Sequence, residues 1–122
     1  MICFTRVPHM VDAKVIEAVN FFKTELEKKG IRIHDLVLFG SSSTGPLQPG
    51  SDIDIAVISD NFSGMDIFMR ARMTRDAELS TIRKYRIALD IITLAPDEFH
   101  DRDSLFFKKI RNGIPVLTTP SA

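Results

Sequence analysis

Two aspartates, Asp52 and Asp54, stand at the start of an apolar stretch that ends at Ile58. Alternate side chains of a strand share a face, so we expect both carboxylates to point the same way, opposite Ile53 and Ile55. Two carboxylates about 4 Å apart repel each other by roughly 1 kcal/mol in water, and by more near a protein interior. The pair therefore indicates either solvated acids at a strand end or a site for a divalent cation such as Mg²⁺.

A glycine-serine turn precedes this pair. Gly40 and Ser41 follow the apolar run 36–39, and ten residues separate Ser41 from Asp52. Gly40 lets the backbone approach a ligand closely, and Ser41 adds a hydroxyl, so the turn is suited to hold phosphate oxygens. We do not expect a P-loop, because Pro46 and Leu47 occupy the positions of its lysine and hydroxyl residue.

A third carboxylate, Asp90, lies inside the apolar stretch 87–92. An aspartate in so apolar a strand costs free energy unless it is hydrogen-bonded, paired or bound to a metal. Alone, it is equally consistent with a structural hydrogen bond. Beside Asp52 and Asp54, we interpret it as the third acid of one site.

Gly-Ser, ten residues, Asp-x-Asp and a later strand aspartate together resemble the signature of the DNA polymerase β-like nucleotidyltransferase superfamily. Within it, the chain is similar to the minimal nucleotidyltransferases (MNT proteins), and the resemblance covers about the whole chain. It implies a single minimal nucleotidyltransferase domain over residues 1–122, acting as a metal-dependent transferase. The expected reaction moves a nucleoside monophosphate, AMP from ATP, to an acceptor hydroxyl.

The resemblance also assigns roles to individual residues. It implies that the catalytic and metal-binding acids are Asp52, Asp54 and Asp90, which would hold two Mg²⁺ ions. It implies that ATP or another nucleoside triphosphate is bound through its phosphates by Gly40, Ser41 and Ser51. MNT proteins are typically paired with a small helical HEPN protein, and in such toxin-antitoxin pairs the MNT protein can act as the antitoxin. The resemblance therefore implies a HEPN-type partner protein as acceptor.

One position departs from the family pattern. Members commonly carry G-S-x-A-R-G at the turn, and this chain has Thr44 where the arginine is usual. Thr44 can hydrogen-bond a phosphate but offers no fixed positive fork. One hypothesis is that Arg72 or Arg75 reaches the triphosphate instead. The alternative to an enzyme is a non-catalytic subunit that binds a nucleotide, or only a partner, and inhibits the partner by occupying it.

Hydrophobic periodicity predicts the elements that position these residues. Helices are predicted over 10–29, 66–85 and 104–112, and strands over 31–39, 51–59, 86–94 and 114–117, the last at a sheet edge. In the second helix, the predicted apolar positions are Ile67, Phe68, Ala71, Leu79 and Ile82. The order indicates an α+β fold (two layers, α/β), with a mixed sheet of about four strands and helices packed mainly on one face.

Composition limits the remaining classes. The 122 residues carry 16 basic and 16 acidic side chains, so zero net charge gives no strong signal for nucleic-acid binding. A single cysteine and no secretory or membrane-spanning stretch indicate a cytoplasmic protein outside the membrane. Three scattered histidines offer no zinc-ligand spacing. Zero net charge and a predicted edge strand make self-association a further hypothesis.

Overall fold

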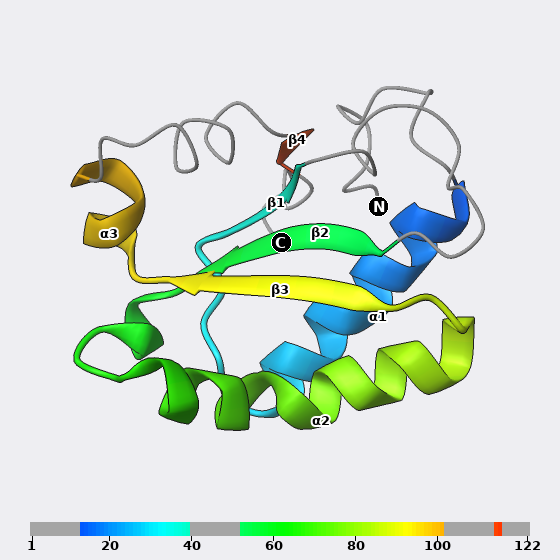
Figure 1. The fold of residues 1–122 in the computed structure, drawn as a ribbon, viewed down its shortest axis with the longest axis horizontal. Helices are drawn as coiled ribbons and strands as arrows, with labels where there is room; N and C mark the ends of the chain where they lie inside the picture. The colour runs from blue at the N-terminus through cyan, green and yellow to red at the C-terminus, as the bar shows by residue number, and fades with distance from the viewer. Residues whose placement is uncertain (1–12, 40–51, 102–113, 116–122) are drawn as a thin grey trace.

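The computed structural model describes residues 13–39, 52–101 and 114–115 of the chain (Figure 1). Its helices and strands follow one another as α-β-β-α-β-α-β, which matches the predicted order up to the third strand; the helix after that strand is Pro96–Asp101 and not the predicted 104–112. They are α1 (Ala13–Lys28), β1 (Asp35–Phe39), β2 (Ile53–Ile58), the 3₁₀ turn η2 (Asp60–Phe62), α2 (Ile67–Tyr85), β3 (Leu89–Leu94), α3 (Pro96–Asp101) and β4 (Ile114–Pro115). The helix predicted over 104–112 lies outside the described residues.

The four strands form one mixed sheet in the order β3-β2-β1-β4. β1 runs antiparallel to both β2 and β4, whereas β2 and β3 are parallel. A parallel pair needs a crossover connection, and α2 provides it between β2 and β3. The mixed sheet and the edge position of β4 are both as predicted.

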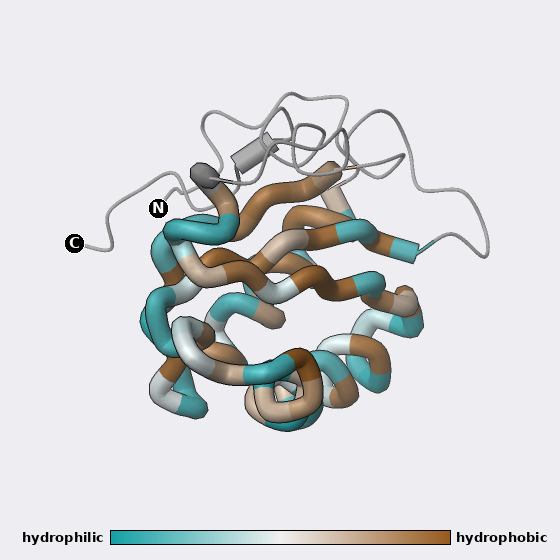
Figure 2. The backbone as a smooth tube through the Cα atoms, turned by 60° about the vertical axis from the view of Figure 1, so that its left-hand side comes forward, coloured by the Kyte–Doolittle hydropathy of each residue, from teal (hydrophilic) through white to brown (hydrophobic). Residues whose placement is uncertain are grey.

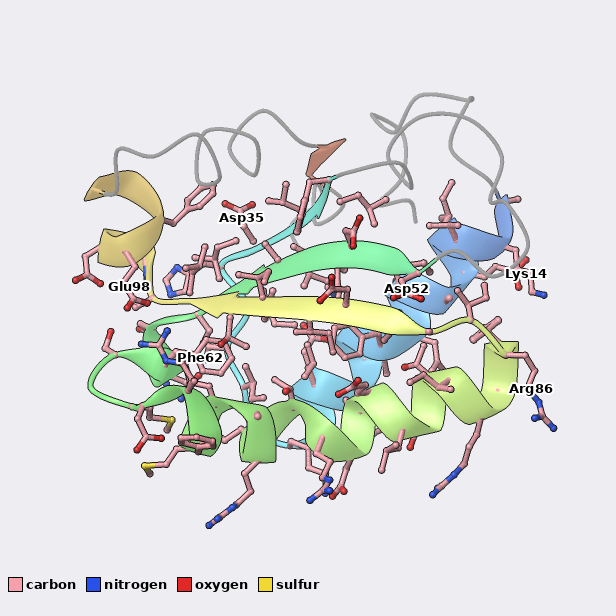
Figure 3. The ribbon with its side chains drawn as sticks, in the orientation of Figure 1. Lys14, Asp35, Asp52, Phe62, Arg86 and Glu98 are labelled. Atoms are coloured by element: carbon pink, nitrogen blue, oxygen red, sulfur yellow. The ribbon has the colours of Figure 1, made fainter. Side chains whose placement is uncertain are left out.

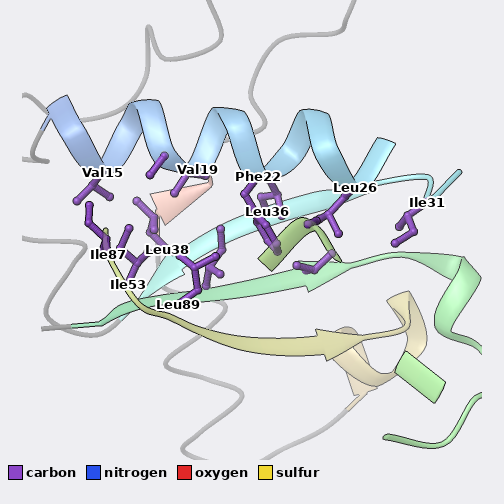
Figure 4. Packing of buried hydrophobic residues seen from close by; sticks show 14 of the residues in the cluster. Val15, Val19, Phe22, Leu26, Ile31, Leu36, Leu38, Ile53, Ile87 and Leu89 are labelled. Atoms are coloured by element: carbon purple, nitrogen blue, oxygen red, sulfur yellow. The ribbon is translucent and has the colours of Figure 1, made fainter. Parts of the chain in front are cut away.

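The first face of the sheet is covered by α1 and α2 (Figures 1 and 2). The buried side chains of α1 recur at steps of three and four, which places them on one side of the helix: Val15, Ala18, Val19, Phe22 and Leu26. They pack onto alternate strand residues that include Leu36, Leu38, Ile53 and Leu89 (Figure 4). The helix ends before Gly30, whose φ of 85° is the left-handed conformation predicted for its cap.

The second face of the sheet carries a smaller cluster of buried residues. Phe99 of α3 packs there with strand side chains, namely Val37, Phe39, Ala56, Ile58 and Leu94. The helices therefore lie mainly on the first face, as predicted, with the short α3 on the second. Asp54 lies two residues before Ala56 in β2, so it belongs to the second face, away from α1 and α2.

The buried side of α2 differs from the prediction. Of its predicted core positions, only Ile82 packs against the core, while Ile67 and Phe68 are 71% and 75% exposed. The buried residues of this helix are instead Arg70, Thr74, Ala77 and Thr81. Apolar content therefore predicts the wrong orientation of α2 about its own axis.

Hydrogen bonds explain why polar residues are stable on this buried side. Arg70 is 7% exposed, and its guanidinium donates to the carbonyls of Met65 and Thr93 and to both carboxylate oxygens of Glu98. The Thr74 and Thr81 hydroxyls donate to carbonyls one turn earlier in the helix. Each buried polar group thus has a partner, which removes most of its desolvation cost. In the described part of the chain, no helix is long and apolar enough to cross a membrane.

Candidate active site

The centre of the site is a pair of carboxylates on adjacent strands. Asp54 of β2 and Asp90 of β3 are directly opposite each other in the parallel register. Residues paired in this way have side chains on the same face, and neighbouring strands lie about 4.8 Å apart. Asp54 is half-buried and Asp90 is exposed. The fold thus brings together two acids that are 36 residues apart in the sequence.

Asp52 lies just before β2, at the end of the strand where Asp54 also lies (Figure 3). Its side chain is exposed. Residues 40–51 connect Phe39 at the end of β1 to this point, and Phe39 is the register partner of Asp54. The predicted phosphate-binding residues Gly40, Ser41 and Ser51, and Thr44 with them, lie outside the described residues.

The donor atoms of these acids suit Mg²⁺, which is bound in proteins mainly by one or two carboxylates, phosphates and water. Asp54 and Asp90 supply two carboxylates on one face, and the exposed Asp52 adds a third at the strand end. Among the described side chains, no group of three or more His, Cys, Asp or Glu lies close enough to form a complete metal site. The structure therefore shows a carboxylate pair in register, with the third acid beside it rather than in one closed cluster.

A cleft of about 420 Å³ opens between α2 and β3, which lies at the opposite edge of the described sheet from β4. Asp90 and Glu78 line it, together with Thr74 and Thr93. Burial raises the pKa of Glu78, whereas Arg75 lowers it and the nearby charge of Asp90 raises it. Glu78 was not predicted as a site residue, although it falls one turn after Thr74 on the same side of α2.

The arginines proposed to replace the missing cation are placed on the outside of α2. Arg72 and Arg75 are exposed and line a second hollow, of about 350 Å³, together with Phe68, Ala71 and Glu78. Neither arginine forms an ion pair with another side chain in the described part of the chain. Their contact with a triphosphate stays a prediction, because the turn that would hold the phosphates is not described.

Comparison with known proteins decides the family. Residues 19–112 match the family model described as a nucleotidyltransferase domain. The chain belongs to the nucleotidyltransferase domain family. The matched segment contains Asp52, Asp54 and Asp90 and also the glycine-serine turn, so every predicted site residue of this nucleotidyltransferase lies within it.

A solved structure supports the same fold. A crystal structure of a candidate nucleotidyltransferase from Sulfolobus solfataricus matches with a TM-score of 0.60 and 18% sequence identity, covering 84% of this chain and 80% of the other. A search of curated protein sequences gives no significant match. The nucleotidyltransferase fold is therefore shown both by the family model and by the arrangement of the elements.

Proposed function

We propose that this nucleotidyltransferase is a Mg²⁺-dependent enzyme that transfers AMP from ATP to a hydroxyl group on a partner protein. The observation that carries the proposal is the register of Asp54 with Asp90, which sets two carboxylates side by side in a domain of this family. A like-charged pair in adjacent strands is unfavourable by itself, and a cation between the two acids would relieve the repulsion.

The proposed roles follow the positions of the residues. Asp52 and Asp54 would hold two Mg²⁺ ions, and Asp90, from the edge strand, would hold the ion nearer the acceptor and orient the acceptor hydroxyl. When bound, such ions neutralise the charge that develops on the transferring phosphoryl group. Gly40, Ser41 and Ser51 would bind the phosphates, because their segment begins and ends beside Asp54 in the sheet register.

The proposed partner rests on the sequence signature that resembles the MNT proteins. A small helical HEPN-type protein would supply the acceptor hydroxyl, and the pair would form a cytoplasmic toxin-antitoxin system with this chain as the antitoxin. In this proposal, ATP is the nucleotide substrate. The partner would complete the site on the acceptor side, where Asp90 borders an open cleft.

A non-catalytic role is the second candidate, and Thr44 favours it. Without the usual arginine at the turn, phosphate binding would depend on backbone N–H groups and hydroxyls, which are weaker ligands than a guanidinium. In that role the chain would bind a nucleotide or a partner without transferring a phosphoryl group.

The experiment uses purified protein, Mg²⁺ and ATP labelled on either its α- or its γ-phosphate, with a lysate of the native host as the source of acceptor. We expect label to pass to a macromolecule from α-labelled ATP only. The Asp52→Asn/Asp54→Asn double variant should lose this transfer, while Asp97→Asn, which removes an exposed carboxylate on α3, should keep it. Transfer from γ-labelled ATP would show a kinase, and Mg²⁺-dependent ATP binding without transfer would support the non-catalytic role.

A further inference from the structure

The outer side of α2 carries an unusual stripe of exposed residues. Phe68, Arg72, Arg75 and Leu79 follow one another at steps of four, three and four, so they lie on one side of the helix. Phe68 is 75% exposed and Leu79 is 40% exposed, and both arginines are exposed. The stripe therefore has apolar ends and a cationic middle. We call these four residues the α2 stripe.

Exposed large apolar residues are concentrated on this helix. In the described part of the chain they are Ile67, Phe68, Met69 and Leu79, and all four belong to α2. Such a concentration on one element marks an interaction surface more often than single scattered residues do. The hollow of about 350 Å³ lies between Phe68 and the two arginines of the stripe, so the surface is also concave there.

From this pattern, we infer that the α2 stripe is a docking surface for an amphipathic helix of another protein, with apolar residues at its ends and acidic residues in its middle. Helices pack by fitting rows of side chains at steps of three and four into one another, and the stripe is such a row. Arg72 and Arg75 form no ion pair with described residues, so both guanidinium groups are available to carboxylates of a partner.

Charge argues against a second copy of the chain as the occupant. If two α2 helices packed antiparallel about a two-fold axis, the central arginines of one stripe would face those of the other. Like charges that face each other across an interface are unfavourable. An acidic helix from a different protein gives the opposite sign at the same positions.

The surroundings of the stripe argue against nucleic acid. The chain has zero net charge, so it gives no long-range attraction for a polyanion. The exposed Ile67 and Phe68 offer apolar area that a phosphate backbone does not use. A protein helix matches both the apolar and the charged parts of the surface.

The stripe also adjoins the candidate active site. Glu78 lines both the hollow beside the stripe and the cleft that contains Asp90. A helix docked on the stripe would therefore lie near the cleft at the β3 edge of the sheet, while the carboxylate pair faces the other side; any contact with the acceptor rests on the proposed function. The docking itself needs neither nucleotide nor metal.

The test uses two designed helical peptides of about 18 residues, long enough to span the stripe at 1.5 Å per residue. Both carry leucines that face Phe68 and Leu79, and the middle positions are glutamates in one peptide and lysines in the other. Binding is measured without ATP or metal, by fluorescence anisotropy for affinity and by amide NMR shifts for location. We expect the glutamate peptide to bind at least about tenfold more tightly than the lysine peptide and to shift amides of the stripe.

Three variants sharpen the test. Arg72→Glu/Arg75→Glu should reverse the preference between the two peptides, and Phe68→Ser should weaken both. Lys28→Glu makes the same kind of charge change on exposed α1 and should alter neither affinity. Each variant changes an exposed residue, so circular dichroism should show an unchanged fold.

Equal binding of the two peptides, or NMR shifts away from α2, would overturn the inference. So would a concentration-dependent dimer that Phe68→Ser dissociates, which would assign the surface to a second copy, or tighter binding of a single-stranded oligoribonucleotide at the same arginines. These outcomes are independent of label transfer from ATP, so failure of the docking inference can be told from failure of the proposed function.

Discussion

In the cleft between α2 and β3, the fold changes the pKa of one carboxyl group, that of Glu78. Burial raises the pKa of Glu78, Arg75 opposes this, and the charge of Asp90 adds to it. A carboxyl group with a raised pKa in the folded state binds its proton more tightly there than in the unfolded chain. The protein therefore loses stability as pH rises from the ordinary pKa of 4.5 through the raised value.

Glu78→Gln should stabilise the metal-free protein at neutral pH. Glutamine keeps the shape of the protonated side chain and removes the charge that burial and Asp90 disfavour. We expect a gain of under about 1 kcal/mol, since solvent screens a half-buried carboxylate, and the gain should vanish well below pH 4.5. Urea unfolding at the two pH values measures it. A variant less stable than wild type at neutral pH would show that Glu78 is stabilised in its charged form.

At the scale of elements, α2 is held by one polar residue that joins three parts of the chain. Arg70 contacts Met65 before its own helix, Thr93 at the end of β3 and Glu98 in α3, and it also lies 5.9 Å from the ring centre of Phe62. These contacts place the guanidinium where a hydrophobic side chain would otherwise be expected. Thr93 lies near the end of the edge strand β3, and its carbonyl accepts one of these bonds from Arg70. This contact pairs a backbone group that the sheet edge would otherwise expose.

Arg70→Met should therefore destabilise the fold by about 2–4 kcal/mol, because it removes the guanidinium donor from two carbonyls and from the Glu98 carboxylate, which keeps the Ala95 N–H as a donor. Arg72→Met, two residues away and exposed, should change stability by less than about 0.5 kcal/mol. Chemical denaturation of the two variants measures the difference. Adding Glu98→Gln to Arg70→Met should restore part of the loss, and equal stability of both single variants would contradict this role of Arg70.

The orientation of α2 about its axis can be tested with apolar residues. Phe68→Ala should change the free energy of unfolding by less than about 0.5 kcal/mol, because Phe68 is exposed. Leu26→Ala on α1 should cost about 2–5 kcal/mol, because Leu26 is fully buried. Thermal and urea unfolding of both variants give the comparison. A large loss for Phe68→Ala without a binding partner present would mean that the helix turns its other side to the sheet.

The sequence predicted most of the described fold for a simple reason. In α1 and in the strands, burial follows apolar periodicity, so Val15, Phe22 and Ile55 face the core as expected. Strand ends were predicted too long, as in 31–39 against Asp35–Phe39, because an apolar run does not show where pairing stops. The predicted orientation of α2 about its axis was wrong. The buried Arg70 is stabilised by Thr93 and Glu98, which are distant in sequence, and no local pattern reveals such partners.

In the candidate site, too, local patterns were predicted and contacts between distant segments were not. Alternation within a strand predicted that Asp52 and Asp54 share a face, and the family signature brought in Asp90. That Asp54 and Asp90 are direct neighbours depends on the strand register, which the sequence does not encode locally. Glu78 was missed because only the packing of α2 beside β3 brings it near Asp90.

At the scale of the whole molecule, one face of the sheet forms the main core and the other carries the candidate site. The first face is closed by α1 and α2 and holds the main core, whereas the second carries the carboxylate pair at one end and Phe99 of α3 with the smaller cluster. The acids thus lie on a rigid sheet, on the side that the long helices leave uncovered. This arrangement suits the proposed site, in which a nucleotide and an acceptor would both have to reach a metal ion.

The most direct test of the account is Mn²⁺ binding, followed by electron paramagnetic resonance in the presence of a non-hydrolysable ATP analogue. We predict that Asp54→Asn and Asp90→Asn each weaken Mn²⁺ binding at least about tenfold, because each removes a carboxylate ligand from the ion. Asp35→Asn, on the same sheet face at the opposite end of β1, should bind Mn²⁺ as wild type does. Wild-type affinity in both Asp54 and Asp90 variants would contradict the central claim that these two acids form one metal site.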